Sequence, residues 1–135
     1  MARARGARPH LVTSPEHGQA SYARRLDWGA SGAGALVADA RPGDVAVVVD
    51  VLSFTTTLSV AVEGGIAVYP YPWSVEDAAS YAADRDAVLA VGRREGLASG
   101  AVSLSPVSFE GVSGIERVVL PSPNGSAISL GVAES

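Results

Sequence analysis

The stretch Val45-Ala46-Val47-Val48-Val49-Asp50-Val51-Leu52-Ser53-Phe54-Thr55-Thr56-Thr57 decides which fold the sequence predicts. Its first part, up to Leu52, is apolar except for Asp50, and such a run is typical of a strand buried on both faces of a parallel sheet. Apolar residues at helical spacing follow, so a helix is predicted from about Thr55 to Glu63, with Gly64-Gly65 as its stop. The stretch therefore predicts a strand that passes directly into a helix.

A carboxylate and several hydroxyls lie where this predicted strand meets the predicted helix. In open α/β sheets, ligands bind at the carboxyl ends of the strands, and the start of a helix favours anions there. Asp50 is therefore a candidate catalytic acid or metal ligand, although capping a helix or a loop would be an ordinary role for it. Thr55, Thr56 and Thr57 are candidates for binding an anion, and their ordinary role would be to start the helix.

Turn residues and short apolar runs predict the same order of strand and helix along the rest of the chain. Further strands are predicted at 20–28, 66–69, 87–91 and 117–120, a turn at 29–32, and further helices at 33–38, 75–83 and from 127 onward. Ser74 is the predicted cap of one of these helices. The segment from Arg93 to Gly114 is predicted to be an irregular loop. This order predicts an α/β fold in three layers, α/β/α, around a largely parallel sheet.

The 135 residues suit one domain with a core of its own. We expect this domain to occupy residues 20–135, after a flexible N-terminal segment at 1–19. The last predicted helix reaches Ser135 without a stop signal. We therefore expect the chain to be the N-terminal part of a longer domain, truncated at the C-terminus.

Two more polar clusters follow predicted strands and are expected at the same sheet edge as Asp50. Arg93 and Arg94 follow Gly92, and guanidinium groups bind phosphate, sulfonate or carboxylate through paired hydrogen bonds. Taken alone, such arginines are most often solvated surface charges, and an Asn-Gly pair is often only a turn. One carboxylate among many oxygen donors suits Mg²⁺, which keeps several waters and binds substrate phosphate. The third cluster consists of Ser122, Asn124, Gly125 and Ser126.

Composition excludes several classes of function. The chain has no cysteine, which excludes disulfides and thiolate zinc sites, and all ten basic residues are arginine, which excludes Schiff-base chemistry. A net charge of −4 argues against a nucleic-acid-binding face, and no apolar run approaches the ~18–20 residues that span a bilayer. We expect a cytoplasmic protein whose partner is a small anionic phosphate substrate, with no nucleic acid and no membrane; a homo-oligomer is left open.

The three polar clusters together resemble the 2-phosphosulfolactate phosphatase family. The resemblance covers about residues 22–135. It implies a three-layer α/β fold and a Mg²⁺-dependent phosphatase that removes phosphate from 2-phospho-3-sulfolactate, a step toward coenzyme M. It also implies that Asp50 is a metal ligand or the nucleophile, and that Thr55–Thr57 and Asn124–Ser126 lie beside the phosphate. The motifs that carry it are Asp50-Val51-Leu52-Ser53-Phe54-Thr55-Thr56-Thr57, Gly64-Gly65, Ser105-Pro106 and Ser122-Pro123-Asn124-Gly125-Ser126, with Asp27-Trp28-Gly29 and Gly32 upstream.

The chain departs from the resembled family at three places. Family members often have arginine where Ser53 stands, an acidic residue near Arg93, and an aspartate and an asparagine in the segment that matches Gly100 to Leu104. Because fewer carboxylates weaken a Mg²⁺ site, two hypotheses stay open. The first is a Mg²⁺-dependent phosphatase with Asp50 in the catalytic role and Arg94 among the phosphate-binding residues. The second is a non-catalytic module that binds an anion or metabolite and has lost the catalytic acids.

Overall fold

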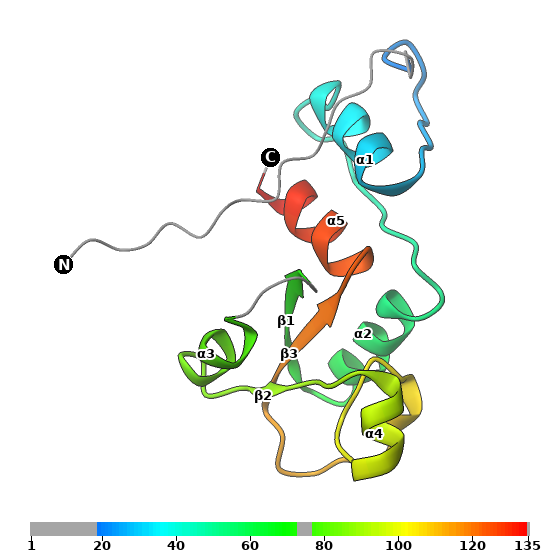
Figure 1. Ribbon diagram of the computed structural model, residues 1–135. Coiled ribbons are helices and arrows are strands. Elements are labelled where there is room, and N and C mark those ends of the chain that lie inside the picture. The colour runs from blue at the N-terminus through cyan, green and yellow to red at the C-terminus, as the bar shows by residue number, and fades with distance from the viewer. Residues whose placement is uncertain (1–18, 73–76, 135) are drawn as a thin grey trace, which may run out of the picture.

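The computed structural model describes residues 19–72 and 77–134. These residues form helices around a small parallel sheet whose strands follow the order β1-β3-β2 (Figure 1). Both strand pairs are parallel, and helices pack around the sheet, which confirms the predicted α/β class with a parallel sheet. The sheet is open. The strands are β1 (Ala67–Pro72), β2 (Val88–Leu89) and β3 (Arg117–Ser122). The helices are α1 (Gly29–Ala38), α2 (Phe54–Glu63), α3 (Ala78–Ala83), α4 (Arg93–Ser99), the 3₁₀ helix η1 (Pro106–Phe109) and α5 (Gly125–Ala133).

The middle strand, β3, carries the centre of the core. Val118, Val119 and Leu120 are fully buried because β1 and β2 pair with β3 on its two sides. β1 is an edge strand, which is where a sheet tolerates the missing N–H of Pro70. Helices α2 and α5 both pack against β1 and touch each other, whereas α3 packs against β2 and β3. Figure 1 accordingly shows α3 to the left of the strands and α2 and α4 to their right.

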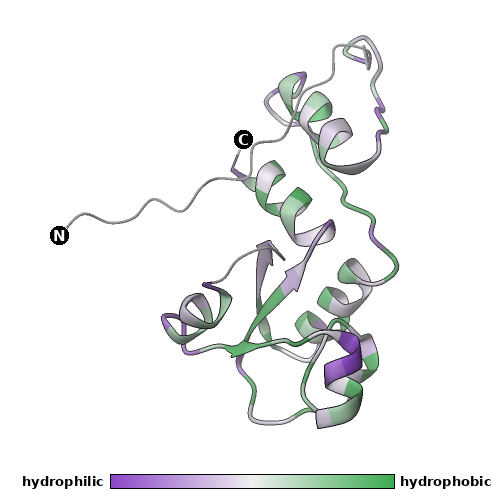
Figure 2. Cartoon of the chain, in the orientation of Figure 1, coloured by the Kyte–Doolittle hydropathy of each residue, from purple (hydrophilic) through white to green (hydrophobic). Residues whose placement is uncertain are grey.

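The predicted central strand at 45–52 is wrong. The segment has no strand pairing and runs as an extended chain from α1 to α2, visible at the right margin of Figure 1. Its alternate valines face solvent, with exposed fractions of 85% for Val45, 79% for Val47 and 69% for Val49, and Figure 2 shows it as an apolar trace outside the sheet. The apolar pattern predicts that the segment is buried, but it does not identify a neighbouring strand with which the segment could pair. Here α1 packs against α5, so the chain must cross from there to the start of α2.

Three other local predictions are corrected. The segment 20–28 is not a strand, and Tyr22, Leu26 and Trp28 are exposed. A helix begins at Gly29, where a turn was predicted, because buried small residues such as Gly32 and Ala33 let α1 pack closely. The predicted loop from Arg93 to Gly114 contains α4 and η1. Gly100, in the left-handed conformation with φ 73°, ends α4, as glycine favours at such a position.

Several predictions fall on residues without a description. The N-terminal segment 1–18 and the predicted helix cap Ser74 lie outside the described residues. Helix α3 is observed from Ala78, within the predicted range 75–83, and β3 and α5 lie where strand and helix are predicted. In the part of the chain that the structure describes, every helix is too short or too polar to cross a bilayer.

The exposure of the valines in segment 45–52 predicts that substituting one of them has little effect on the free energy of unfolding. Val47→Ala should change the free energy of unfolding by at most about 0.5 kcal/mol, because surface substitutions without buried contacts stay in that range. Val119→Ala, the matched control in β3, should cost about 2 kcal/mol, because two buried methyl groups are lost and a cavity is left. Urea unfolding followed by circular dichroism measures both values. A cost for Val47→Ala equal to that of Val119→Ala would show that 45–52 is a buried strand in solution.

Candidate active site

The starts of α2 and α5 lie side by side at the carboxyl edge of the sheet. The backbone of Gly125, the first residue of α5, is in contact with the ring of Phe54, the first residue of α2. A methyl group built on Gly125 would overlap that ring and lie 2.5 Å from the Cβ of Phe54. The structure therefore brings together the polar cluster that follows Asp50 and the polar cluster that follows β3.

The third cluster joins this edge through Arg93. Its Nε donates to the carbonyl of Leu104 at 2.8 Å, and its Nη2 donates to the hydroxyl of Ser53, the N-cap residue of α2. The Ser53 hydroxyl donates in turn to the carbonyl of Leu104 at 2.7 Å. Arg94, the predicted phosphate-binding arginine, is exposed and has no side-chain hydrogen bond or ion pair among the described residues. Its role stays a prediction.

Asp50 lies in the turn that leads into α2 and is half-buried. Its backbone is held at both ends, because its carbonyl accepts the N–H of Thr55 at 3.0 Å and its N–H donates to the Thr55 hydroxyl at 3.2 Å. Its carboxylate makes no hydrogen bond or ion pair with any described residue. The turn is thus fixed while the acid itself is available to a ligand.

The three threonines that follow differ in what their hydroxyls do. The Thr55 hydroxyl donates to the carbonyl of Asp50 at 2.9 Å, and the Thr56 hydroxyl donates to the carbonyl of Val51 at 3.0 Å. Both therefore hold the turn that starts α2, which is the ordinary role considered for them. Thr57 is fully buried, and its hydroxyl has no partner among the described residues. Contact of these hydroxyls with a phosphate stays a prediction.

The turn after β3 is also tied down by its own hydroxyls. The Ser126 side chain is fully buried and donates to the carbonyl of Leu120 at 2.7 Å. The N–H of Gly125 donates to the Ser122 hydroxyl at 3.2 Å. Asn124 is exposed at the N-cap of α5, and its side chain makes no capping bond. Of this cluster, Asn124 is thus the side chain placed to meet a ligand from solvent.

A small hollow lies between the end of β2 and the turn after β3. It measures about 210 Å³ and is lined by Gly92, Arg93, Leu104 and Pro123. The sequence places Arg93 in an arginine pair suited to binding an anion, with a solvated surface charge as its ordinary role, and it gives no sign that the carbonyl of Leu104 would anchor this side chain. A backbone acceptor has no sequence signature, whereas an arginine just after a strand end does.

The described residues contain no group of three or more His, Asp or Glu side chains arranged to hold a metal ion. Asp50 brings to this edge a carboxylate that makes no hydrogen bond or ion pair with any described residue. Mg²⁺ is often held by one or two carboxylates together with waters and the phosphate of a substrate. The donor set therefore fits a Mg²⁺ shared with a phosphate, and it does not fit an ion enclosed by protein ligands alone.

Aromatic side chains near the end of β1 form a packed cluster. The rings of Tyr71 and Tyr81 have centroids 4.5 Å apart, and the guanidinium carbon of Arg85 lies 3.4 Å from the centroid of Tyr81. Burial, and after it the charge of Asp77, raises the pKa of the Tyr71 phenol above its ordinary value. Tyr71 is thus a neutral packing residue at neutral pH and not a base.

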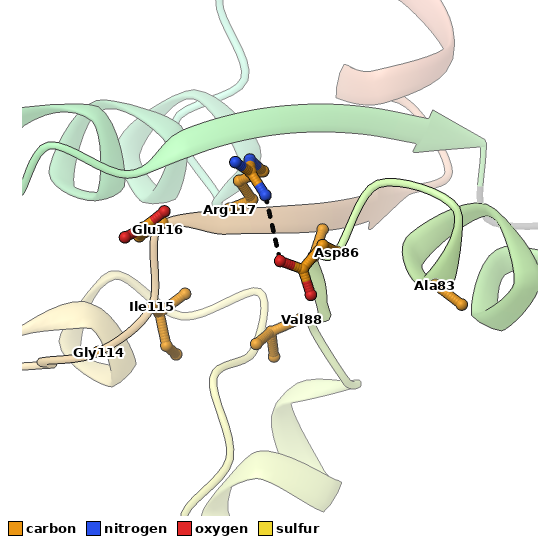
Figure 3. Close-up of a pocket in the computed structure, with 8 residues that line it drawn as sticks. Ala83, Asp86, Val88, Gly114, Ile115, Glu116 and Arg117 are labelled. Atoms are coloured by element: carbon orange, nitrogen blue, oxygen red, sulfur yellow. Dashed lines mark hydrogen bonds and ion pairs between the residues drawn. The ribbon is translucent and has the colours of Figure 1, made fainter.

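A larger hollow, of about 440 Å³, lies at the opposite end of β2 and β3 (Figure 3). Its charged lining residues are Asp86, Glu116 and Arg117, and Asp86 and Arg117 pair with each other at 3.3 Å. The remaining lining, including Val88 and Ile115, is mostly apolar or backbone. Ligands of open α/β sheets bind at the carboxyl ends of the strands, and this hollow lies at the amino ends. It is the weaker candidate.

An open parallel sheet with two helix starts, a free carboxylate and an arginine at its carboxyl edge defines an α/β domain of the kind that binds and processes anionic ligands. A family model described as 2-phosphosulpholactate phosphatase matches residues 34–134. The chain belongs to this family, which confirms the resemblance and supports a phosphatase-like function. No curated protein and no solved structure matches the chain.

Proposed function

We propose that the chain is a Mg²⁺-dependent phosphatase that hydrolyses 2-phospho-3-sulfolactate to 3-sulfolactate and phosphate, in the cytoplasm. Family membership supports the class of reaction. The observation that carries the proposal is Asp50, a half-buried residue four positions before the first residue of α2, whose carboxylate has no partner among the described residues. Because an acid without a structural partner contributes little to folding, a ligand is the better explanation for its position.

The reacting phosphate would lie between Asp50 and the starts of α2 and α5. Both helices have at least nine residues, and their N-terminal N–H groups favour a negative charge at that end. Asn124, exposed at the start of α5, is placed to donate to the same group. Phosphoryl transfer needs little more than positioning and charge neutralisation, which is what these groups supply.

Asp50 has two roles that the geometry serves equally. As a metal ligand it would hold Mg²⁺ against the phosphate, and the ion would supply charge neutralisation. As a nucleophile its oxygen would bond to phosphorus while the ester oxygen leaves and takes a proton, and water would then hydrolyse the acyl phosphate. The fixed backbone of the turn orients the carboxylate in either role.

A second candidate function is a non-catalytic module that binds a small anion. The absence of any metal-binding group of three acids or histidines among the described residues favours it. Such a module would use the same helix starts and the same arginine. It would need neither Mg²⁺ nor the carboxylate of Asp50.

One experiment separates the two functions. Incubated with 2-phospho-3-sulfolactate, the protein should release phosphate at a rate that rises with Mg²⁺ and falls to background when the ion is chelated. Calorimetry with inorganic phosphate should show tighter binding in the presence of Mg²⁺. Equal binding with and without Mg²⁺, together with no phosphate release, would overturn the phosphatase proposal in favour of the binding module.

A further inference from the structure

The guanidinium of Arg93 is held in place by two acceptors on one of its edges. Nε donates to the carbonyl of Leu104 and Nη2 donates to the hydroxyl of Ser53. That hydroxyl is itself fixed, because it donates to the same carbonyl at 2.7 Å. A guanidinium anchored in this way is preorganised, so binding a further ligand costs little side-chain entropy.

The opposite edge of the guanidinium is free. An arginine carries five N–H donors, and two of them are engaged here. Across residues 19–72 and 77–134, Arg93 forms no ion pair, whereas Arg25 pairs with Asp44 and Arg117 pairs with Asp86. The edge formed by Nη1 and Nη2 thus offers two parallel donors and an uncompensated positive charge.

This free charge lies at the wall of the small hollow. Gly92, Leu104 and Pro123 form the rest of the lining, and none of them is charged. Pro123 immediately precedes Asn124, the N-cap of α5, and Ser53 is the N-cap of α2. The hollow is therefore next to the place proposed for the reacting phosphate, and it is large enough for a small additional group.

We propose that Arg93 is a specificity-determining residue that binds a second anionic group of the substrate, a carboxylate or a sulfonate, while the phosphate lies at Asp50. This inference rests on the proposed function of the site. One guanidinium edge matches two oxygens of one anionic group. The substrate of the proposed function, 2-phospho-3-sulfolactate, carries both kinds of group beside its phosphate, and Arg93 would hold one of them.

Three esters that differ in the second group test this assignment. They are 2-sulfoethyl phosphate, phosphoglycolate and ethyl phosphate, and only the last lacks a second anion. Arg93→Ala should lower kcat/KM for the first two by on the order of 10- to 100-fold, the usual loss for a hydrogen-bonded charge. It should leave kcat/KM for ethyl phosphate within about threefold of the wild-type value. A greater loss with sulfoethyl phosphate than with phosphoglycolate would identify the sulfonate as the preferred group.

Two further variants separate binding from folding. Arg93→Lys keeps the charge without the bidentate edge, so it should give an intermediate loss on the two anionic esters and none on ethyl phosphate. If thermal melting shows that Arg93→Ala does not fold, the losses measured with Arg93→Lys test the assignment in its place. Arg24→Ala, at an exposed arginine before α1, is the matched control and should change none of the three values. An equal loss on all three esters, or no loss on any, would overturn the assignment.

The same esters distinguish this inference from the proposed function. If the wild-type protein hydrolyses neither these esters nor 2-phospho-3-sulfolactate, each ester is used as a ligand in calorimetry. Selective loss of binding of the two anionic esters in Arg93→Ala would then uphold the role of Arg93 while the phosphatase proposal fails. Binding that is unchanged by Arg93→Ala, or absent in the wild type, would overturn both.

Discussion

Asp50→Asn should lower the rate of phosphate release by at least about 10³-fold while the protein stays folded. The substitution removes the negative charge that either role of Asp50 requires, since a neutral amide binds Mg²⁺ weakly and does not attack phosphorus. It keeps the shape of the side chain. The carboxylate has no hydrogen bond or ion pair with a described residue, so its removal breaks no structural contact. Steady-state release of phosphate and thermal melting measure the two quantities.

The control for this experiment is Asp84→Asn. Asp84 is an exposed aspartate at the end of α3. Its substitution by asparagine changes the net charge by the same amount as Asp50→Asn. It should leave both the rate and the melting temperature unchanged. If Asp50→Asn retains the wild-type rate, Asp50 is not the catalytic acid. If Asp50→Asn melts well below the wild type, the carboxylate has a structural partner and the reasoning from its freedom fails.

The elements that could be predicted from the sequence are those specified by local signals. Helix α2 has apolar residues at helical spacing and a glycine pair at its end, and it is observed at Phe54–Glu63. Strand β3 is a short apolar run between turns, and it is observed at Arg117–Ser122. In both elements the apolar residues that form the sequence pattern also pack in the core, so local preference and tertiary packing favour the same structure.

The apolar segment 45–52 shows where local reasoning ends. Its pattern is as strong as that of β3, but a strand exists only when a neighbour supplies hydrogen bonds, and that neighbour is remote in sequence. The packing of α1 against α5 draws this segment along the outside of the molecule. The small residues of α1, among them Gly32 and Gly34, permit that packing. The composition of residues 29–32 alone predicts a turn.

The candidate site could be predicted in part for the same reason. The three polar clusters are predicted to share one edge, and the contacts of Phe54 with Gly125 and of Arg93 with Ser53 bring them together. Only the clusters at Arg93 and Ser122 follow observed strands, whereas Asp50 reaches the edge through the turn before α2. The sequence does not predict which side-chain donors already form hydrogen bonds within the protein. The hydroxyls of Thr55 and Ser126 bond to backbone carbonyls. Serine stands at 53 where the resembled family often has arginine, and the structure places the guanidinium of Arg93 on that serine.

Gly125→Ala should destabilise the protein by about 3 kcal/mol and should also lower activity. In an ordinary helix the change would stabilise by up to about 1 kcal/mol, because alanine is the better helix former, so the sign is diagnostic. Here the added methyl would overlap the ring of Phe54, and overpacking of this kind typically costs 1–3 kcal/mol, occasionally more. To relieve the overlap, the start of α5 must move away from the start of α2. The groups proposed to surround the phosphate would then separate.

A double-mutant cycle with Phe54→Ala isolates this contact. Phe54 is 1% exposed, so Phe54→Ala alone should cost about 3–5 kcal/mol. Phe54→Ala removes the ring atoms that overlap the methyl but leaves the Cβ of residue 54, which lies 2.5 Å from it. Gly125→Ala should therefore cost at least about 1 kcal/mol less in this background than in the wild type, which is a coupling between the two positions. Urea unfolding gives the free energies of unfolding of the wild type, the two single variants and the double variant. A fall in kcat/KM reports that the two helix starts have moved apart. The same cost for Gly125→Ala in both backgrounds would mean that the ring does not lie against this glycine. The two helix starts would then not be joined at the site, and the phosphate would have to be held by Asp50 and the start of α2 without α5.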